Sequence, residues 1–140
     1  MCRVAVVVVA FVVCAWLSGC GPTEPPLYPV SGSVKFRDGK PAAGATVEFA
    51  IQHDGKTVNA RGVVNEAGAY QLKTVLDGKE KDGALAGSHK VIVVSASASS
   101  SPGPQPAPVP VRYAEYGNSG LTFEVKPGAA NDYPITVERK

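Results

Sequence analysis

The feature that most constrains the fold of this chain is a series of short alternating runs, each closed by a glycine-containing turn. Apolar and polar residues alternate along residues 30–36 and again along residues 46–51. This period of two is typical of β-strands with one buried face. Asp-Gly pairs at 38–39 and 54–55 follow these runs, and Asp-Gly is a strong hairpin signal. The pattern therefore predicts strands joined by tight turns.

Similar runs continue to the end of the chain. We expect further strands at residues 57–64, 69–75, 88–94, 121–125 and 134–137. The second half of residues 88–94 is wholly apolar, which is typical of an interior strand covered on both faces. Residues 77–87 are charged and contain three glycines, and they predict a loop. The sequence thus predicts an all-β fold, a single antiparallel seven-stranded β-sandwich, with a small closed barrel as the alternative.

Length and charge limit the classes of function. A chain of 140 residues allows one domain. Its 14 basic and 12 acidic residues nearly balance, so the chain lacks the strongly basic surface of an electrostatic nucleic-acid binder. We expect no nucleic-acid partner.

The N-terminus has the pattern of an export signal. Arg3 is the only charged residue before Glu24, and residues 4–17 are uninterrupted apolar residues. This apolar run is shorter than the roughly 20 residues of a membrane-spanning helix. A basic start followed by a short apolar core is typical of a signal peptide. A retained signal anchor and a buried core segment are the alternatives.

The end of this segment resembles the lipobox of bacterial lipoproteins. The motif is Leu17-Ser18-Gly19-Cys20, an aliphatic residue, two small residues and a cysteine. The resemblance implies cleavage between Gly19 and Cys20, so that residues 1–19 are a signal peptide, and a thioether from Cys20 to diacylglycerol. The other two cysteines lie within residues 1–19 and would leave with the signal. The mature domain would then have neither a free thiol nor a disulfide.

Two segments of unusual composition flank or interrupt the predicted strands. Residues 20–29 contain four prolines and predict an extended tether from the lipidated Cys20 to a domain spanning residues 30–140. Residues 96–110 are rich in serine, alanine and proline and predict a flexible loop within that domain. A proline-rich ligand for a partner, or a spacer, is the alternative for this loop.

Several motifs together resemble the carboxypeptidase regulatory-like (transthyretin-like) domains of bacterial surface lipoproteins, especially planctomycete ones. They are PVSGSV at 29–34, DGKPAAGATV at 38–47, NEAGAYQL at 65–72, GSHKV at 87–91, RY at 112–113 and SGLTFEV at 119–125. The resemblance spans nearly the whole mature chain. It implies a prealbumin-like or immunoglobulin-like sandwich used as an accessory or adhesive module. It implies no common reaction or ligand.

The sequence offers little for catalysis or metal binding. His53 lies in a turn beside Asp54-Gly55 and His89 opens an apolar run, and no cysteine or Glu/Asp-x-His arrangement accompanies them. A zinc or copper site needs three or four convergent ligands. Transthyretin-like hydroxyisourate hydrolases end in Tyr-Arg-Gly-Ser, whereas this chain ends Val137-Glu138-Arg139-Lys140. We therefore expect no metal, no cofactor and no enzymatic activity, with a transthyretin-like hydrolase as the least favoured class.

One cluster is a candidate partner-binding site. Arg112, Tyr113 and Tyr116 follow the flexible segment closely. Arginine and tyrosine are enriched among the residues that dominate binding energy in interfaces. The alternative is that the tyrosines pack against the edge of the sandwich.

These observations predict an exported, lipid-anchored, non-catalytic protein of the cell envelope. It would be a structural or protein-interaction module, with a carbohydrate- or peptide-binding accessory module as the alternative. The expected partners are membrane lipid, through acylated Cys20, and an envelope protein or polysaccharide. Gly21, rather than aspartate, follows Cys20. By resemblance to enterobacterial sorting, this residue favours the outer membrane or the cell surface.

Overall fold

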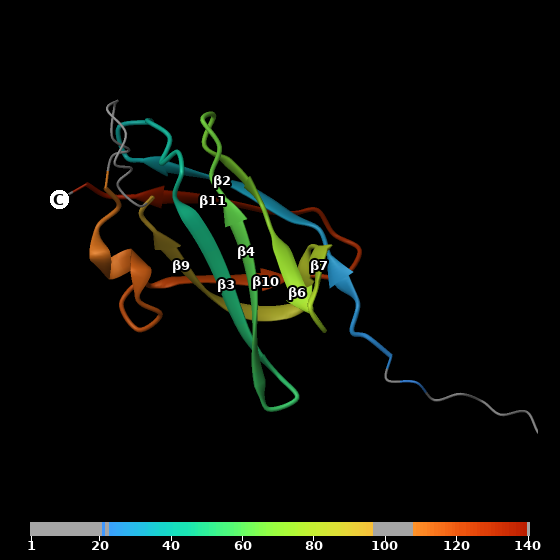
Figure 1. The fold of residues 1–140 in the computed structure, drawn as a ribbon. Coiled ribbons are helices and arrows are strands. Elements are labelled where there is room, and N and C mark those ends of the chain that lie inside the picture. The colour runs from blue at the N-terminus through green and yellow to red at the C-terminus, as the bar shows by residue number, and fades with distance from the viewer. Residues whose placement is uncertain (1–20, 22, 97–107, 140) are drawn as a thin grey trace, which may run out of the picture.

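The computed structural model describes Gly21, residues 23–96 and residues 108–139, and these form an all-β structure (Figure 1). The strands are β1 (Leu27–Tyr28), β2 (Val30–Phe36), β3 (Thr46–His53), β4 (Lys56–Val63), β5 (Ala69–Gln71), β6 (Lys73–Leu76), β7 (Lys79–Asp82), β8 (Ala84–Leu85), β9 (Gly87–Val94), β10 (Leu121–Val125) and β11 (Asn131–Val137). A single turn of 3-10 helix, η1 (Val111–Ala114), precedes β10. No helix in the described residues is long and apolar enough to cross a membrane.

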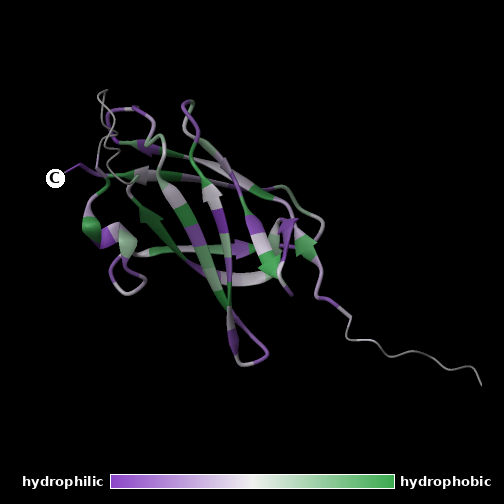
Figure 2. Ribbon diagram, in the orientation of Figure 1, coloured by the Kyte–Doolittle hydropathy of each residue, from purple (hydrophilic) through white to green (hydrophobic). Residues whose placement is uncertain are grey.

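The strands form three open sheets in a sandwich-like arrangement. The larger sheet has the order β10-β9-β3-β4-β6-β7, and the smaller has the order β11-β2-β5. β1 and β8 form a separate pair. Apolar and polar residues alternate along strands of both larger sheets (Figure 2). Inward residues such as Val34, Phe36, Phe49 and Val91 are at most 1% exposed and form the core between the two larger sheets.

The all-β prediction is confirmed, but the prediction of seven purely antiparallel strands differs from the structure in two ways. The described residues contain eleven strands, and β11 pairs with β2 in parallel from Asn131↔Val30 to Val137↔Phe36. The additional strands are short, and alternation over two to four residues gives no clear signal. Alternation also has the same form in parallel and antiparallel strands, so it does not encode the direction of β11.

The predicted strand at residues 69–75 is broken at Leu72. β5 pairs with β2 in the smaller sheet, whereas β6 pairs with β4 in the larger sheet. The backbone N–H of Leu72 donates to Val30 O, and its carbonyl accepts from Gly83 N–H. A Cβ at Gly62 would lie 2.3 Å from the carbonyl oxygen of Gln71. The chain therefore changes sheets where β4 passes very close to it, and only glycine leaves room.

The prediction of a charged loop at residues 77–87 is wrong, because β7, β8 and the start of β9 lie there. β7 pairs with β6 in a hairpin, and the turn between them has positive φ at Asp77 (48°) and Gly78 (75°). β8 then pairs with β1, so Leu27 and Tyr28 of the predicted tether belong to a small sheet. Sheet pairing thus begins before Val30, where we expected the folded domain to start.

The interior strand predicted at residues 88–94 is confirmed. β9 lies between β10 and β3, and Val91, Ile92 and Val93 are all buried. The predicted signal peptide (residues 1–19), Cys20 and most of the predicted flexible loop (residues 97–107) lie outside the described residues.

Candidate functional site

The first two predicted partner-binding residues, Arg112 and Tyr113, lie on η1 and are occupied by contacts within the domain. Tyr113 is only 7% exposed and belongs to the core. Its hydroxyl accepts hydrogen bonds from Nη2 of Arg112 (2.9 Å) and from the backbone N–H of Glu138 (3.1 Å). The Tyr113 ring is therefore not available to a partner. This tyrosine instead packs against the sandwich, as the alternative interpretation of the sequence predicts.

Arg112 belongs instead to a charged cluster at the end of β11. Its Nη2 lies 2.7 Å from Oε2 of Glu138, and Arg37 contacts Oε1 of the same carboxylate at 2.6 Å. The hydrogen bond from Arg112 and the charge of Arg37 lower the pKa of Glu138. All three side chains are exposed enough for water and salt to screen these pairs.

Tyr116 lies elsewhere, at the outer face of the larger sheet. Its hydroxyl donates to Oε1 of Glu48 on β3 at 2.5 Å, and Nε of Arg61 on β4 donates to Oε2 at 2.5 Å. Burial and the Glu48 contact raise the pKa of Tyr116, so its phenol stays protonated at neutral pH. The structure thus separates Tyr116 from Tyr113, and the three predicted residues do not form one site.

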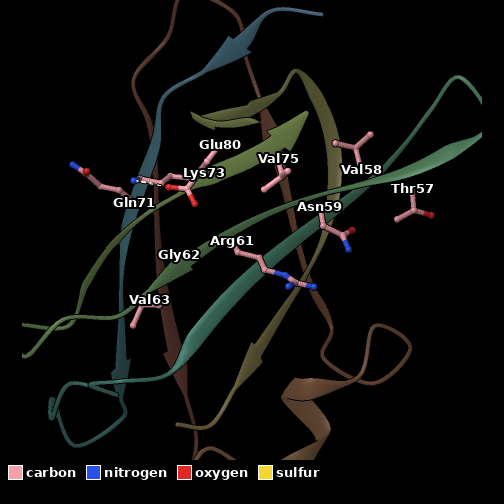
Figure 3. A pocket seen from close by; sticks show the side chains of 10 residues that line it. All are labelled: Thr57, Val58, Asn59, Arg61, Gly62, Val63, Gln71, Lys73, Val75 and Glu80. Atoms are coloured by element: carbon pink, nitrogen blue, oxygen red, sulfur yellow. Dashed lines mark hydrogen bonds and ion pairs between the residues drawn. The ribbon is translucent and has the colours of Figure 1, made fainter. Parts of the chain in front are cut away.

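A groove along β4 is the most site-like feature of this outer face. Its volume is about 710 Å³ (Figure 3). We name it the β4–β6 groove, and it is lined by Thr57, Val58, Asn59, Arg61, Gly62, Val63, Gln71, Lys73, Val75 and Glu80. None of these residues was predicted to be functional.

The groove exists because β4 is paired unequally on its two sides. β4 pairs with β3 over eight residue pairs, from Thr46↔Val63 to His53↔Lys56. It pairs with β6 over two, Ala60↔Thr74 and Arg61↔Lys73. The β3–β4 hairpin extends away from β6 and β7 beyond that point (Figure 1). The first half of β4 therefore has a strand partner on one side only within the described residues.

Two ion pairs border the groove. Arg61 is held by Glu48, and Nζ of Lys73 lies 2.8 Å from Oε1 of Glu80. The hydrogen bond and charge of Glu80 raise the pKa of Lys73. Two of the lining cations thus already have acidic neighbours.

Apolar and unpaired polar groups also line the groove. Val63 and Val75 are 66% and 61% exposed, because they lie at outward positions of their strands. The side-chain Oδ1 of Asn59 is buried without a hydrogen-bond partner in the described structure. Buried polar atoms usually have partners. Apolar residues at outward strand positions are the one sequence signal that marks this groove.

The two histidines lie apart in the fold. His53 ends β3 beside the hairpin turn, and its Nε2 lies 3.4 Å from Oδ2 of Asp54. His89 is 2% exposed, packs beside Phe49 and has Nε2 at 2.8 Å from Leu85 O. Among residues 21, 23–96 and 108–139, no group of three or more His, Cys, Asp or Glu side chains is placed to hold a metal ion.

The predicted lipidation and cleavage motif lies outside the described residues; it comprises Leu17, Ser18, Gly19 and Cys20. Comparison of the chain with protein-family models, with curated proteins and with solved structures finds no match at any of these three levels.

Proposed function

We propose that this protein is exported, anchored in a bacterial membrane through lipid on Cys20, and acts as a non-catalytic interaction module of the cell envelope. Its domain would be a prealbumin-like or immunoglobulin-like sandwich. The lipobox-like motif and the preceding apolar run support the anchoring. Two or three acyl chains on one cysteine would hold the protein firmly at the membrane surface, because each buried methylene contributes about 0.8 kcal/mol.

The way the N-terminal segment joins the domain supports this role. β1 pairs with β8, and Glu24 contacts Lys81 of β7. The segment leaves the domain at the end opposite η1 and the C-terminus (Figure 1). A membrane anchor before this segment would therefore turn the η1 end of the domain away from the lipid.

The observation that carries the interaction role is the β4–β6 groove. A monomeric domain rarely leaves a strand partly unpaired beside two exposed valines unless that surface has a use. None of the ten lining residues is aromatic, whereas the carbohydrate-binding alternative predicts an exposed aromatic platform. The groove therefore favours a protein or peptide partner over a polysaccharide.

The anchoring is tested by a Cys20→Ser variant of the full chain expressed in a Gram-negative bacterium. We expect the wild-type protein in the membrane fraction, with a mass that corresponds to a chain starting at a diacylated or triacylated Cys20. The variant should appear in the soluble fraction or keep residues 1–19. A Cys14→Ser variant is the matched control and should behave as wild type, because that cysteine lies in the cleaved segment. A Cys20→Ser protein that is cleaved and stays in the membrane fraction would show that the motif has another role.

A further inference from the structure

The parallel pairing of β2 and β11 brings charged residues together at one end of the domain. The register ends at Val137↔Phe36, so the next residues of the two strands, Glu138 and Arg37, emerge side by side. The backbone N–H of Glu138 also donates to the Tyr113 hydroxyl, which holds η1 against this end of the sheet. We use the name arginine cluster for the five charged residues gathered here, Arg37, Asp38, Arg112, Glu138 and Arg139.

The arginine cluster has more guanidinium groups than carboxylates. Arg37 and Arg112 share the two oxygens of one carboxylate, that of Glu138. Nε of Arg139 lies 3.4 Å from Oδ2 of Asp38, which is longer than a charge-assisted hydrogen bond. Three positive charges thus face two negative ones, and all five side chains are between 43% and 78% exposed. A guanidinium has five N–H donors, so each arginine keeps donors for a further carboxylate after these contacts.

Two of these guanidinium groups lie over buried aromatic rings. Cζ of Arg112 is 4.7 Å from the centroid of the Tyr113 ring, and Cζ of Arg139 is 4.4 Å from that of Phe36. An arginine that is already stacked loses less freedom when it binds an anion. The two rings are only 7% and 1% exposed, so neither offers a face on which a sugar could stack. The cluster is therefore arranged for anionic groups and not for sugar rings.

Two neighbouring hollows of the surface meet at the cluster. The first has a volume of about 460 Å³ and is lined by Arg37, Asp38, Glu138 and Arg139. The second has a volume of about 500 Å³ and is lined by Pro110, Val111, Arg112, Glu138 and Arg139. Val111 is 73% exposed, so an apolar surface lies directly beside the arginines of the second hollow. These surfaces suit a ligand that combines several acidic groups with an apolar side chain.

We propose that the arginine cluster docks an acidic segment of a partner protein. Carboxylates of the partner pair with the three arginines, and an apolar side chain packs on Val111. The exposed valine and the buried rings favour a protein over a polysaccharide. A membrane does not fit this surface, because the anchored segment leaves the domain at the opposite end (Figure 1). The inference rests on the proposed interaction role, and it adds a surface that is separate from the β4–β6 groove and the chemistry of its partner.

The test uses the full chain purified in a non-ionic detergent and the synthetic peptide acetyl-EDVEVDE-amide as the probe, with binding followed by isothermal titration calorimetry. One comparison peptide has glutamine and asparagine in place of the acidic residues, and a second has serine in place of valine. We expect the neutral peptide to bind at least about tenfold more weakly and the serine peptide several-fold more weakly. Added salt should also weaken binding of the acidic peptide, because the cluster is exposed to solvent.

Variants of the protein test the named residues. Arg139→Gln should weaken binding of the acidic peptide about two- to fivefold. Lys56→Gln is the matched control, since it removes the same charge from the turn of the β3–β4 hairpin, and it should change the affinity less than about twofold. Val111→Ser should weaken binding of the valine peptide and leave the affinity for the serine peptide unchanged. Glu138→Gln removes the carboxylate that competes for two arginines, so binding should tighten about threefold. Circular dichroism checks that each variant is folded.

Several results would overturn the inference. They are no measurable binding of the acidic peptide, equal binding of the acidic and neutral peptides, equal effects of Arg139→Gln and Lys56→Gln, and unchanged or weaker binding to folded Glu138→Gln. Tighter binding of pentagalacturonate, which carries the same number of carboxylates as the peptide, would assign the cluster to an anionic polysaccharide instead. None of these results touches the lipid anchor, which Cys20→Ser tests separately, and loss of the anchor would leave the peptide affinity of the domain unchanged.

Discussion

A Gly32→Ala substitution probes the packing of the smaller sheet more sharply than any other single change. Gly32 lies in the middle strand, between Tyr133 of β11 and Tyr70 of β5. The buried Tyr70 side chain reaches across it, and the hydroxyl donates to the carbonyl oxygen of Tyr133 at 2.8 Å. A Cβ at Gly32 would lie 2.1 Å from that carbonyl oxygen and 2.7 Å from the Tyr70 hydroxyl. No side chain fits there without moving both groups.

The expected cost follows from these contacts. Forcing a methyl group into packed structure costs about 1–3 kcal/mol. Displacing the Tyr70 hydroxyl adds about 1 kcal/mol, because a buried carbonyl loses its partner. Restricting the unfolded chain returns about 0.5 kcal/mol. The free energy of unfolding should therefore fall by about 2–3 kcal/mol, which lowers Tm by about 10 °C in a domain of this size.

Equilibrium urea unfolding followed by far-UV circular dichroism measures this loss. Gly117→Ala is the matched control, because a Cβ there has nothing within 4 Å, and it should change stability by less than about 0.5 kcal/mol. Tyr70→Phe alone should cost about 1 kcal/mol. The Gly32→Ala cost should persist in the Tyr70→Phe background, since the closest contact is with the backbone of Tyr133. A Gly32→Ala protein as stable as the control would refute this description of the sheet.

Three further predictions concern other contacts. Burial lowers the pKa of His89 below 6.5, so the imidazole binds a proton more readily in the unfolded chain than in the folded one. The free energy of unfolding should therefore fall as the pH drops below about 6.5. Urea unfolding at pH 7.5 and 5.5 measures this loss, and His89→Gln should make the loss smaller. Thr74→Val removes a buried hydrogen bond of 2.7 Å to Gly83 O and should cost about 1–2 kcal/mol in the same assay. Tyr116→Phe breaks the contact with Glu48 and should speed amide hydrogen exchange in residues 116–119 while leaving the β3 core protected.

Three strands of this fold follow directly from alternation over five residues or more. Runs at 30–36, 46–51 and 121–125 lie within or coincide with β2, β3 and β10, and their inward residues form the core. The direction of β11 was not predictable, because a parallel partner and an antiparallel partner bury the same residues of a strand. The strand at 57–64 was predicted within one residue, but its unequal pairing depends on where neighbouring strands end.

The candidate site depends on a feature that local sequence does not encode. Residues 69–76 alternate as one strand, yet the chain changes sheets at Leu72, next to the point where a Cβ at Gly62 of β4 would meet the carbonyl oxygen of Gln71. Both glycine and leucine are compatible with an unbroken strand. The partner residues predicted at Arg112 and Tyr113 were chosen by residue type. Burial of Tyr113 in the core, with its hydroxyl bonded to the backbone N–H of Glu138, is a tertiary outcome that residue type alone does not predict.

The change of sheet at Leu72 also explains why β4 pairs with β6 over two residues only. Because β5 is held by β2, only the part of the chain after Leu72 is left to pair with β4, and the Arg61↔Lys73 pair is where that pairing starts. β6 then turns into β7 after Leu76, while the β3–β4 hairpin continues in another direction. The start of β4 is therefore left without a second strand partner within the described residues, whereas Val75 is exposed because it faces outward and its neighbour Thr74 faces the core.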